Sequence, residues 1–265
     1  MGRAWLRALV VLVPTTAWAS LSFIGLAKQW PLVGEVWRFS RFAFDELGVS
    51  PAMGWACKGA LFTALGIAVL RLFIRRPFLL HALRLDPSMW RLLLLALLVA
   101  LPVQVALGLS PGMQHFYRRF FEVGGAERVL ANAITIVAEH LWIEGVVLGL
   151  ALLPGLVERM RDDERGPRTG RLARFGLGFP AAGPRTVSAW LGVPREAWPA
   201  IVAQGALFFL GHFTKDPGEV ASSLPGGLAV GWLSLRTRSF VPAMVLHLIT
   251  GAVVLGTMAL ARGGG

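Results

Sequence analysis

The sequence predicts an all-α fold, a polytopic membrane bundle of about seven transmembrane helices. The chain of 265 residues is 55% hydrophobic and only 15% charged, and its mean hydropathy is +0.62. These values are too apolar for an ordinary soluble domain. The apolar residues also fall into long windows separated by polar or proline- and glycine-rich stretches. A single cysteine, Cys57, excludes an internal disulfide framework and a cysteine metal cluster.

The long apolar windows predict the positions of the transmembrane helices along the chain. A helix needs about 20 apolar residues to cross a bilayer, and polar or Pro/Gly breakers end each window. The predicted spans lie near residues 5–27, 52–74, 92–110, 129–156, 198–213, 219–235 and 239–261. We expect one structural domain, with helices one to three in residues 1–128 and helices four to seven in residues 129–265.

Two segments outside the core of the bundle have their own interpretations. Residues 1–19 resemble a cleavable secretory signal, but apolar character continues to Ala27, which favours an uncleaved first helix. The stretch 157–197 is rich in Arg, Gly and Pro, and we expect it to be a cytoplasmic loop that contacts lipid.

Basic residues predict the orientation. The net charge is +11, and with a cytoplasmic N-terminus the inner segments hold about twice as many Arg and Lys residues as the outer ones. The charge therefore reflects topology, and we expect no nucleic-acid partner. The Ala-, Arg-, Leu- and Gly-rich composition suggests a multi-pass protein of a bacterial cytoplasmic membrane.

Three predicted spans carry a histidine or carboxylate at apparent membrane depth. They hold Glu139, His140 and Glu144 in 129–156, His212 in 198–213, and His247 in 239–261. A charge near the bilayer centre costs about 2.5–3.5 kcal/mol on insertion scales, so such residues mark partners, water or chemistry. His140 and Glu144 are four apart and share a helix face, whereas Glu139 is rotated from His140 by about 100°. Glu139 can therefore serve a different role from that pair.

The predicted depth of His212 in the membrane does not agree with that of the other two site residues. It lies near the end of 198–213, shallower than Glu139 and His247. We favour a longer fifth helix, starting before Trp198 and continuing past Thr214, over a locally thinned bilayer.

The sequence segments around His212 and His247 match known motifs. They are F-x-x-x-H at Phe208–His212, an arginine-threonine turn at Arg236-Thr237, and Pro242-Ala243 before His247. In chain order with Glu139, these features resemble the CAAX-protease and bacteriocin-processing (CPBP) family of intramembrane glutamic endopeptidases. The resemblance covers about residues 129–260, so residues 129–265 would form a catalytic core of that type.

The resemblance implies roles for three residues. Glu139 matches the general base, which works with His212 to activate a water molecule. His247 matches the histidine that polarises the scissile carbonyl and holds its oxyanion. Phe208 would support the site as part of its motif. The reaction implied is hydrolysis of a peptide bond in a membrane-associated protein or peptide, without a cofactor.

Three positions depart from the family pattern. The family's first motif is E-E-x-x-x-R, but His140 replaces the second glutamate and Glu144 replaces the arginine. Gly251 stands where an Asn or Asp usually follows the last histidine by four, and losing one oxyanion donor costs about 10²–10³ in turnover. His140 and Glu144 restore an acid–base pair with reversed polarity, which we expect to orient Glu139.

Other functions are compatible with the same residues. His140, His212 and His247 with Glu139 offer nitrogen and oxygen ligands for zinc. A catalytically degenerate family member would act as a binding partner in the membrane, and a buried acid–histidine cluster also suits a transporter or proton relay. Lipidated C-terminal tails, leader peptides and sorting tails of exported proteins are all candidate substrates.

Overall fold

The computed structural model describes most of the chain from residue 87 onward. The described residues are 87–118, 121, 125–148, 168, 169, 177, 179, 180, 186–212 and 215–263, with six helical residues between 56 and 68. The predicted span 5–27, most of 52–74, the possible signal at 1–19 and much of the loop 157–197 therefore lie outside the described residues.

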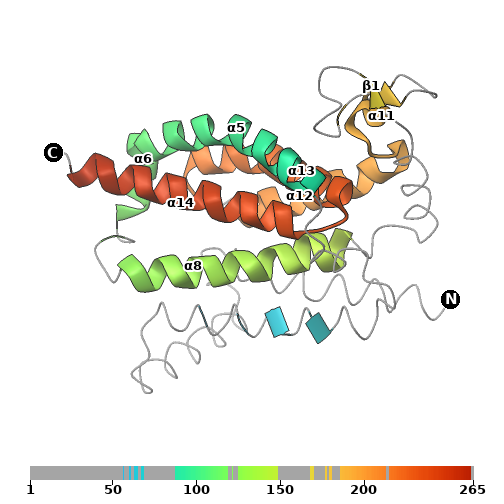
Figure 1. The fold of residues 1–265 in the computed structure, drawn as a ribbon. Coiled ribbons are helices and arrows are strands. Elements are labelled where there is room, and N and C mark those ends of the chain that lie inside the picture. The colour runs from blue at the N-terminus through green and yellow to red at the C-terminus, as the bar shows by residue number, and fades with distance from the viewer. Residues whose placement is uncertain are drawn as a thin grey trace.

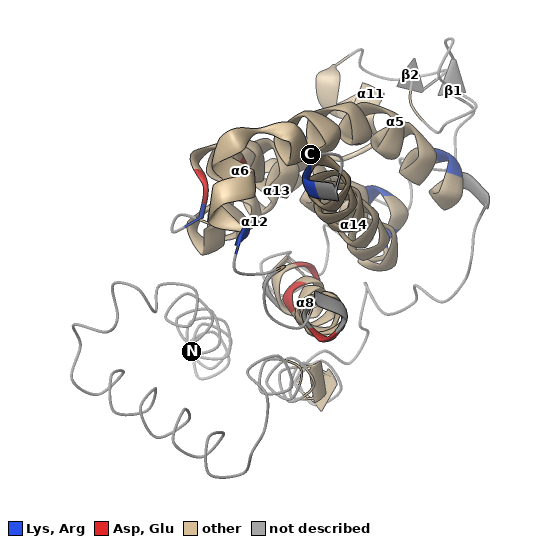
Figure 2. Cartoon of the chain, turned by 90° about the vertical axis from the view of Figure 1, so that its left-hand side faces the viewer, with Lys and Arg blue, Asp and Glu red and all other residues tan. Residues whose placement is uncertain are grey.

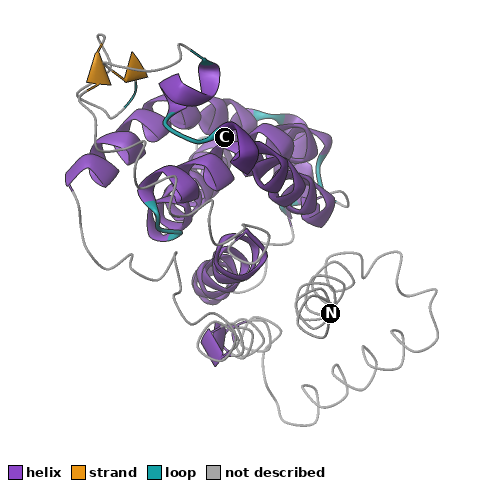
Figure 3. Ribbon diagram, turned by 90° about the vertical axis from the view of Figure 1, so that its right-hand side faces the viewer, coloured by secondary structure: helices purple, strands orange, loops and turns teal. Residues whose placement is uncertain are grey.

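Helices make up nearly all of the described structure, so the predicted all-α class is confirmed (Figures 1 and 3). They are α5 (Pro87–Leu109), α6 (Pro111–Phe116), α8 (Gly125–His140), the π-helix η2 (Leu141–Leu148), α11 (Val187–Leu191), the 3-10 turn η4 (Arg195–Ala197), α12 (Trp198–His212), α13 (Pro217–Thr237) and α14 (Val241–Gly263). Two short strands, β1 (Arg168–Thr169) and β2 (Phe179–Pro180), pair antiparallel, with Arg168 opposite Pro180.

Local signals in the sequence set the ends of α13. Asp216 caps its first turn, because its Oδ1 accepts the Gly218 N–H at 2.8 Å, and Pro217 supplies the first helical residue. Arg238 ends the helix in the left-handed region with φ 55°. The predicted span 219–235 thus lies within two residues of α13 at either end.

The expected extension of the fifth helix is wrong. α12 begins at Trp198, preceded only by the 3-10 turn η4, and it ends at His212. The Lys215 N–H donates to the His212 carbonyl at 2.9 Å, and Asp216 is already the N-cap of α13. His212 is therefore the last residue of its helix.

α5 packs along α14, and α12 packs along α13, which also contacts α14 (Figure 1). Within the described residues, two helices are long and apolar enough to cross a membrane, at Met89–Leu109 and Val241–Arg262. The solvent-accessible side of α5 is apolar, with Leu98 70% exposed, which suits contact with lipid. Charged residues are sparse along α5 and α14, whereas acidic residues gather on α8 and beside α6 (Figure 2).

Close approach of α12 and α13 depends on small residues. A Cβ on Gly227 would lie 3.0 Å from the Gly205 Cα and 2.9 Å from the Phe208 Cβ. Glycine at both positions therefore lets the two backbones meet, as in other membrane helix pairs. This contact fixes Phe208 and the rest of its helix face against α13.

Candidate active site

One cavity of about 980 Å³ opens among α5, α6, α8, α12, α13 and α14. Its lining includes five residues that the sequence singles out, namely Glu139, Phe208, His212, His247 and Gly251. The structure thus brings the three predicted catalytic side chains to one space from three helices. His140 and Glu144 are wholly buried and are not among its lining residues.

The carboxylate of the site comes from Glu139, one residue before the end of α8. Its side chain is 9% exposed, and it borders the cavity. The next residue, His140, is 0% exposed and does not line the cavity. The two neighbours therefore take different surroundings, as the 100° rotation per residue predicts.

His212 is held in one tautomer by its own helix. Its Nδ1 lies 2.7 Å from the Phe208 carbonyl oxygen. Because a carbonyl can only accept, Nδ1 carries the hydrogen, and the neutral ring keeps a lone pair on Nε2. The Phe208 ring stacks on the His212 ring, with 4.5 Å between their centroids, and it meets the His247 ring edge-on, with 5.5 Å between their centroids. Phe208 thus spaces the two histidines.

A continuous line of hydrogen bonds runs behind the cavity, and we call its members, Gln204, Glu144, His140 and His247, the Glu144 relay. Gln204 Nε2 donates to Glu144 Oε1 at 2.9 Å, and Glu144 Oε2 lies 2.7 Å from His140 Nδ1. His140 Nε2 lies 2.9 Å from His247 Nδ1. Gln204, Glu144 and His140 are all 0% exposed.

The relay bears on the expected role of His140 and Glu144 as the pair that orients Glu139. His140 and Glu144 do form the pair that their spacing predicts, but among the described hydrogen bonds His140 contacts His247 and not Glu139. The pair is made where α8 gives way to the π-helix η2, a rare geometry that recurs at functional sites. These contacts connect His140 and Glu144 to His247, and the orientation of Glu139 by this pair stays a prediction.

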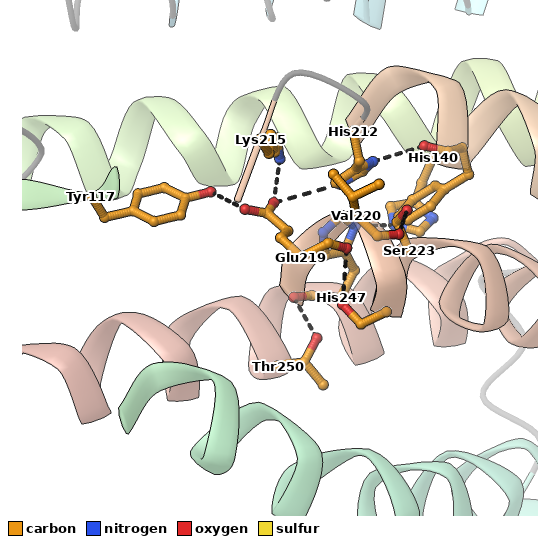
Figure 4. A network of polar contacts seen from close by, with 11 residues as sticks. Tyr117, His140, His212, Lys215, Glu219, Val220, Ser223, His247 and Thr250 are labelled. Carbon is orange, nitrogen blue, oxygen red and sulfur yellow. Dashed lines mark hydrogen bonds and ion pairs between the residues drawn. The ribbon is translucent and has the colours of Figure 1, made fainter. Parts of the chain in front are cut away.

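A second polar group borders the cavity near α6, and we call its members, Tyr117, His212, Lys215 and Glu219, the Glu219 cluster (Figure 4). The Tyr117 hydroxyl donates to Glu219 Oε2 at 2.7 Å, and Lys215 Nζ lies 2.6 Å from Oε1. His212 Nε2 is 3.8 Å from the same Oε1. Burial and the Glu219 carboxylate raise the pKa of Tyr117, so this hydroxyl stays a donor.

Sequence reasoning missed Gln204 and most of the Glu219 cluster. Glu219 and Lys215 flank the start of a predicted span, so they mark a boundary and not a site. Gln204 carries no charge, and it lies in an otherwise apolar window. The signal that could have found it is helical spacing, because Gln204, Phe208 and His212 recur every four residues on one face.

The side of the cavity expected to hold an oxyanion is open at Gly251. Among the described residues, a Cβ built on Gly251 meets only Ile136 Cδ1, at 3.9 Å, so there is room for that atom. Thr250 does not replace the missing donor, because its hydroxyl bonds the Leu246 and His247 carbonyls at 2.9 and 3.0 Å. His247 lines this cavity and is the side chain to which the resemblance assigns the donor role.

The zinc alternative meets a geometric obstacle. Both ring nitrogens of His140 already have partners, in Glu144 and His247. Within the described part of the chain, no group of three or more His, Cys, Asp and Glu residues is arranged to hold a metal ion. A site built from His140, His212 and His247 would require the Glu144 relay to break.

Comparison with known proteins gives one match. A family model described as type II CAAX prenyl endopeptidase Rce1-like matches residues 39–253, which cover most of the chain and every residue of the candidate site. No curated protein and no solved structure matches.

Proposed function

Because the chain belongs to the Rce1-like family of type II CAAX prenyl endopeptidases, which are polytopic membrane proteases, we propose that it hydrolyses a peptide bond of a membrane-associated protein within the bilayer. The observation that carries the proposal is the convergence of Glu139, His212 and His247 on one cavity. Their residue types supply two proton acceptors and one donor, the set that water-driven peptide hydrolysis needs.

The reaction starts with a water molecule between Glu139 and His212. Glu139 takes one proton, and the lone pair of His212 Nε2 accepts the other hydrogen bond, which fixes the direction of the oxygen. The water oxygen bonds to the scissile carbonyl carbon, and the carbonyl oxygen becomes an oxyanion. His247 donates a hydrogen bond to that oxyanion. The C–N bond then breaks, and the proton on Glu139 passes to the leaving amine.

The cavity lining supports a hydrophobic substrate. Much of the lining is aliphatic, and α5 contributes side chains such as Leu95, Val99 and Val103. These suit an apolar or lipid-bearing segment delivered from the bilayer. We propose C-terminal tails or sorting signals of exported proteins as substrates. We place the protein in a bacterial cytoplasmic membrane with its N-terminus in the cytoplasm, as the distribution of basic residues favours.

Membrane proteomes of cells with and without the protein test the proposal. We expect a defined set of membrane proteins to carry shorter C-termini only when the protein is present. Glu139→Gln should reduce this processing by about 10²–10⁴-fold, the usual contribution of a general base, while the variant still inserts. Glu127→Gln, which changes an exposed glutamate of the same helix, is the matched control and should process normally.

Two outcomes would redirect the proposal. Undiminished processing by Glu139→Gln contradicts the mechanism. Retention of the cellular phenotype by Ala variants of Glu139, His212 and His247 favours a binding partner without catalysis. Metal analysis of purified protein, with a chelator added to the assay, tests zinc, because stoichiometric zinc and chelator sensitivity would assign the histidines to a metal.

A further inference from the structure

Building on the proposed function, we infer that the Glu144 relay makes His247 a hydrogen-bond donor toward the cavity, by holding His140 as an imidazolium between Glu144 and His247. The inference concerns Gln204, Glu144 and His140, which act through His247 and are positioning residues. It assigns a use to the two positions at which the first motif departs from the family pattern.

The first step is the direction of each hydrogen bond. A carboxylate only accepts, so the 2.7 Å contact between Glu144 Oε2 and His140 Nδ1 places a hydrogen on Nδ1. At the other end, His140 Nε2 and His247 Nδ1 are 2.9 Å apart, so one of these nitrogens donates and the other accepts. With Glu144 ionised, two arrangements satisfy both contacts, and they differ by one proton.

In the first arrangement His140 is neutral, and His247 Nδ1 donates to it. The Nε2 of His247 then carries only a lone pair, and the buried Glu144 carboxylate accepts hydrogen bonds but has no opposite charge within the relay. In the second arrangement His140 is an imidazolium, and its Nε2 donates to His247 Nδ1. His247 then carries its hydrogen on Nε2, the remaining ring nitrogen of a residue that lines the cavity.

Burial decides between the two arrangements. An isolated ionised group in a low-dielectric interior costs several kcal/mol, whereas an adjacent opposite charge with further hydrogen bonds offsets much of that cost. The imidazolium arrangement pairs Glu144 with His140, and Gln204 donates to the second carboxylate oxygen at 2.9 Å. Charge-assisted bonds of this kind are also the shorter and stronger ones, as the 2.7 Å contact suggests.

The consequence for chemistry is a fixed tautomer at His247. A histidine that must donate to an oxyanion needs its hydrogen on the nitrogen facing the substrate, and the partner of the other nitrogen sets which one carries it. The relay supplies that partner. In this protein His140 and Glu144 together do what a neutral His140 with its hydrogen on Nδ1 would not.

Nitrogen-15 NMR of the full-length protein in lipid vesicles, with ¹⁵N only in its histidine rings, tests the inference without any substrate. At pH 8, histidines in contact with water are neutral. We expect one imidazolium, correlated through its Nε2–H to the Nδ1 of a neutral ring. The His140→Gln variant, which lacks that signal, assigns it. Glu144→Gln, which keeps the shape and removes the charge, should also abolish the signal.

Two matched variants complete the design. Ser234→Ala removes a buried hydroxyl of α13 that has no hydrogen-bond partner among the described residues, and it should leave the imidazolium intact. Glu139→Gln should leave it intact as well, so the relay can be verified even if the protease mechanism fails. In the processing assay, Glu144→Gln should reduce turnover by about 10²–10³-fold, as for loss of one oxyanion donor.

The wild-type spectrum alone can overturn the inference. A neutral His140 ring, or a His247 ring that carries its hydrogen on Nδ1, would mean that the relay presents a lone pair and not a donor. An imidazolium that persists in Glu144→Gln would show that Glu144 does not hold it, and would likewise contradict the inference.

Discussion

All four side chains of the Glu219 cluster line the cavity, whereas the Glu144 relay reaches it only through His247, and the two groups also differ in burial and in connectivity. In the relay, each contact has one donor and one acceptor, and three of its four side chains are fully buried. In the cluster, a single carboxylate is approached by Tyr117, Lys215 and His212, and the Lys215 side chain is 34% exposed. Loss of one side chain of the relay interrupts the chain of hydrogen bonds to His247. In the cluster, the Glu219 carboxylate keeps other partners and access to water when one partner is lost.

The largest effect is expected from Glu144→Ala, which breaks the relay at its charged centre. Removing one member of a buried ion pair costs about 3–5 kcal/mol, because the remaining charge has no partner. We expect unfolding in detergent to show a loss of that size, and processing to fall by about 10²–10³-fold.

The double variant His140→Leu with Glu144→Leu separates stability from catalysis. Apolar replacement of a whole buried pair is often neutral for stability, so this protein should unfold much like wild type and still process slowly. Normal processing by the double variant would mean that the relay has no part in turnover.

A smaller effect, of opposite sign, is expected at Gly251, one turn beyond the end of the relay at His247. Gly251→Asn places a second donor beside His247, and the nearest neighbour of its Cβ is 3.9 Å away. We expect processing to rise by about tenfold. This is less than a full oxyanion donor gives, because the neighbouring side chains do not hold the new amide in the best geometry. Gly251→Ala is the control, since it also replaces the helical glycine by a residue with a Cβ but adds no donor. Equal rates for the Asn and Ala variants would contradict a role for the amide.

The smallest effect is expected from Glu219→Gln in the cluster. A partly exposed ion pair contributes about 0.2–1 kcal/mol, and the amide oxygen still accepts from Tyr117 or Lys215. Processing should change by less than about threefold, measured beside Glu144→Gln. A loss as large as that of Glu144→Gln would mean that the cluster is also part of the reaction and would remove the contrast between the two regions.

The sequence predicts much of the described fold, because hydropathy and helix ends are local properties. The spans 198–213, 219–235 and 239–261 each lie within two residues of a helix in the structure, helped by the Asp216 cap and the Arg238 turn. Only two helices of the described part meet the length and hydropathy expected of a span by themselves. The number seven, the orientation and the division at residue 128 therefore stay predictions.

Only part of the candidate site could be predicted from the sequence. Glu139, His212 and His247 could be selected from the sequence because ionisable groups are rare in apolar windows and because their motifs resemble a family. Their roles stay predictions, although all three reach one cavity. The partner of His140 could not be predicted, since helical spacing reveals the contact with Glu144 but not one with a residue 107 positions away. Gln204 could not be selected from the sequence, because its uncharged amide is distinguished only by its hydrogen bond to the buried Glu144 carboxylate.

The contact between Gln204 and α13 has a consequence for the evolution of this site. A Cβ on Gly231 would lie 2.2 Å from Gln204 Oε1, so no larger residue fits at 231 while the amide keeps its place. A shorter side chain at 204 would relieve that clash, but it would no longer reach Glu144. Positions 204 and 231 should therefore covary among relatives, with glutamine accompanied by glycine. Where Gly231 is replaced, we expect the histidine and glutamate at 140 and 144 to have given way to a different pair.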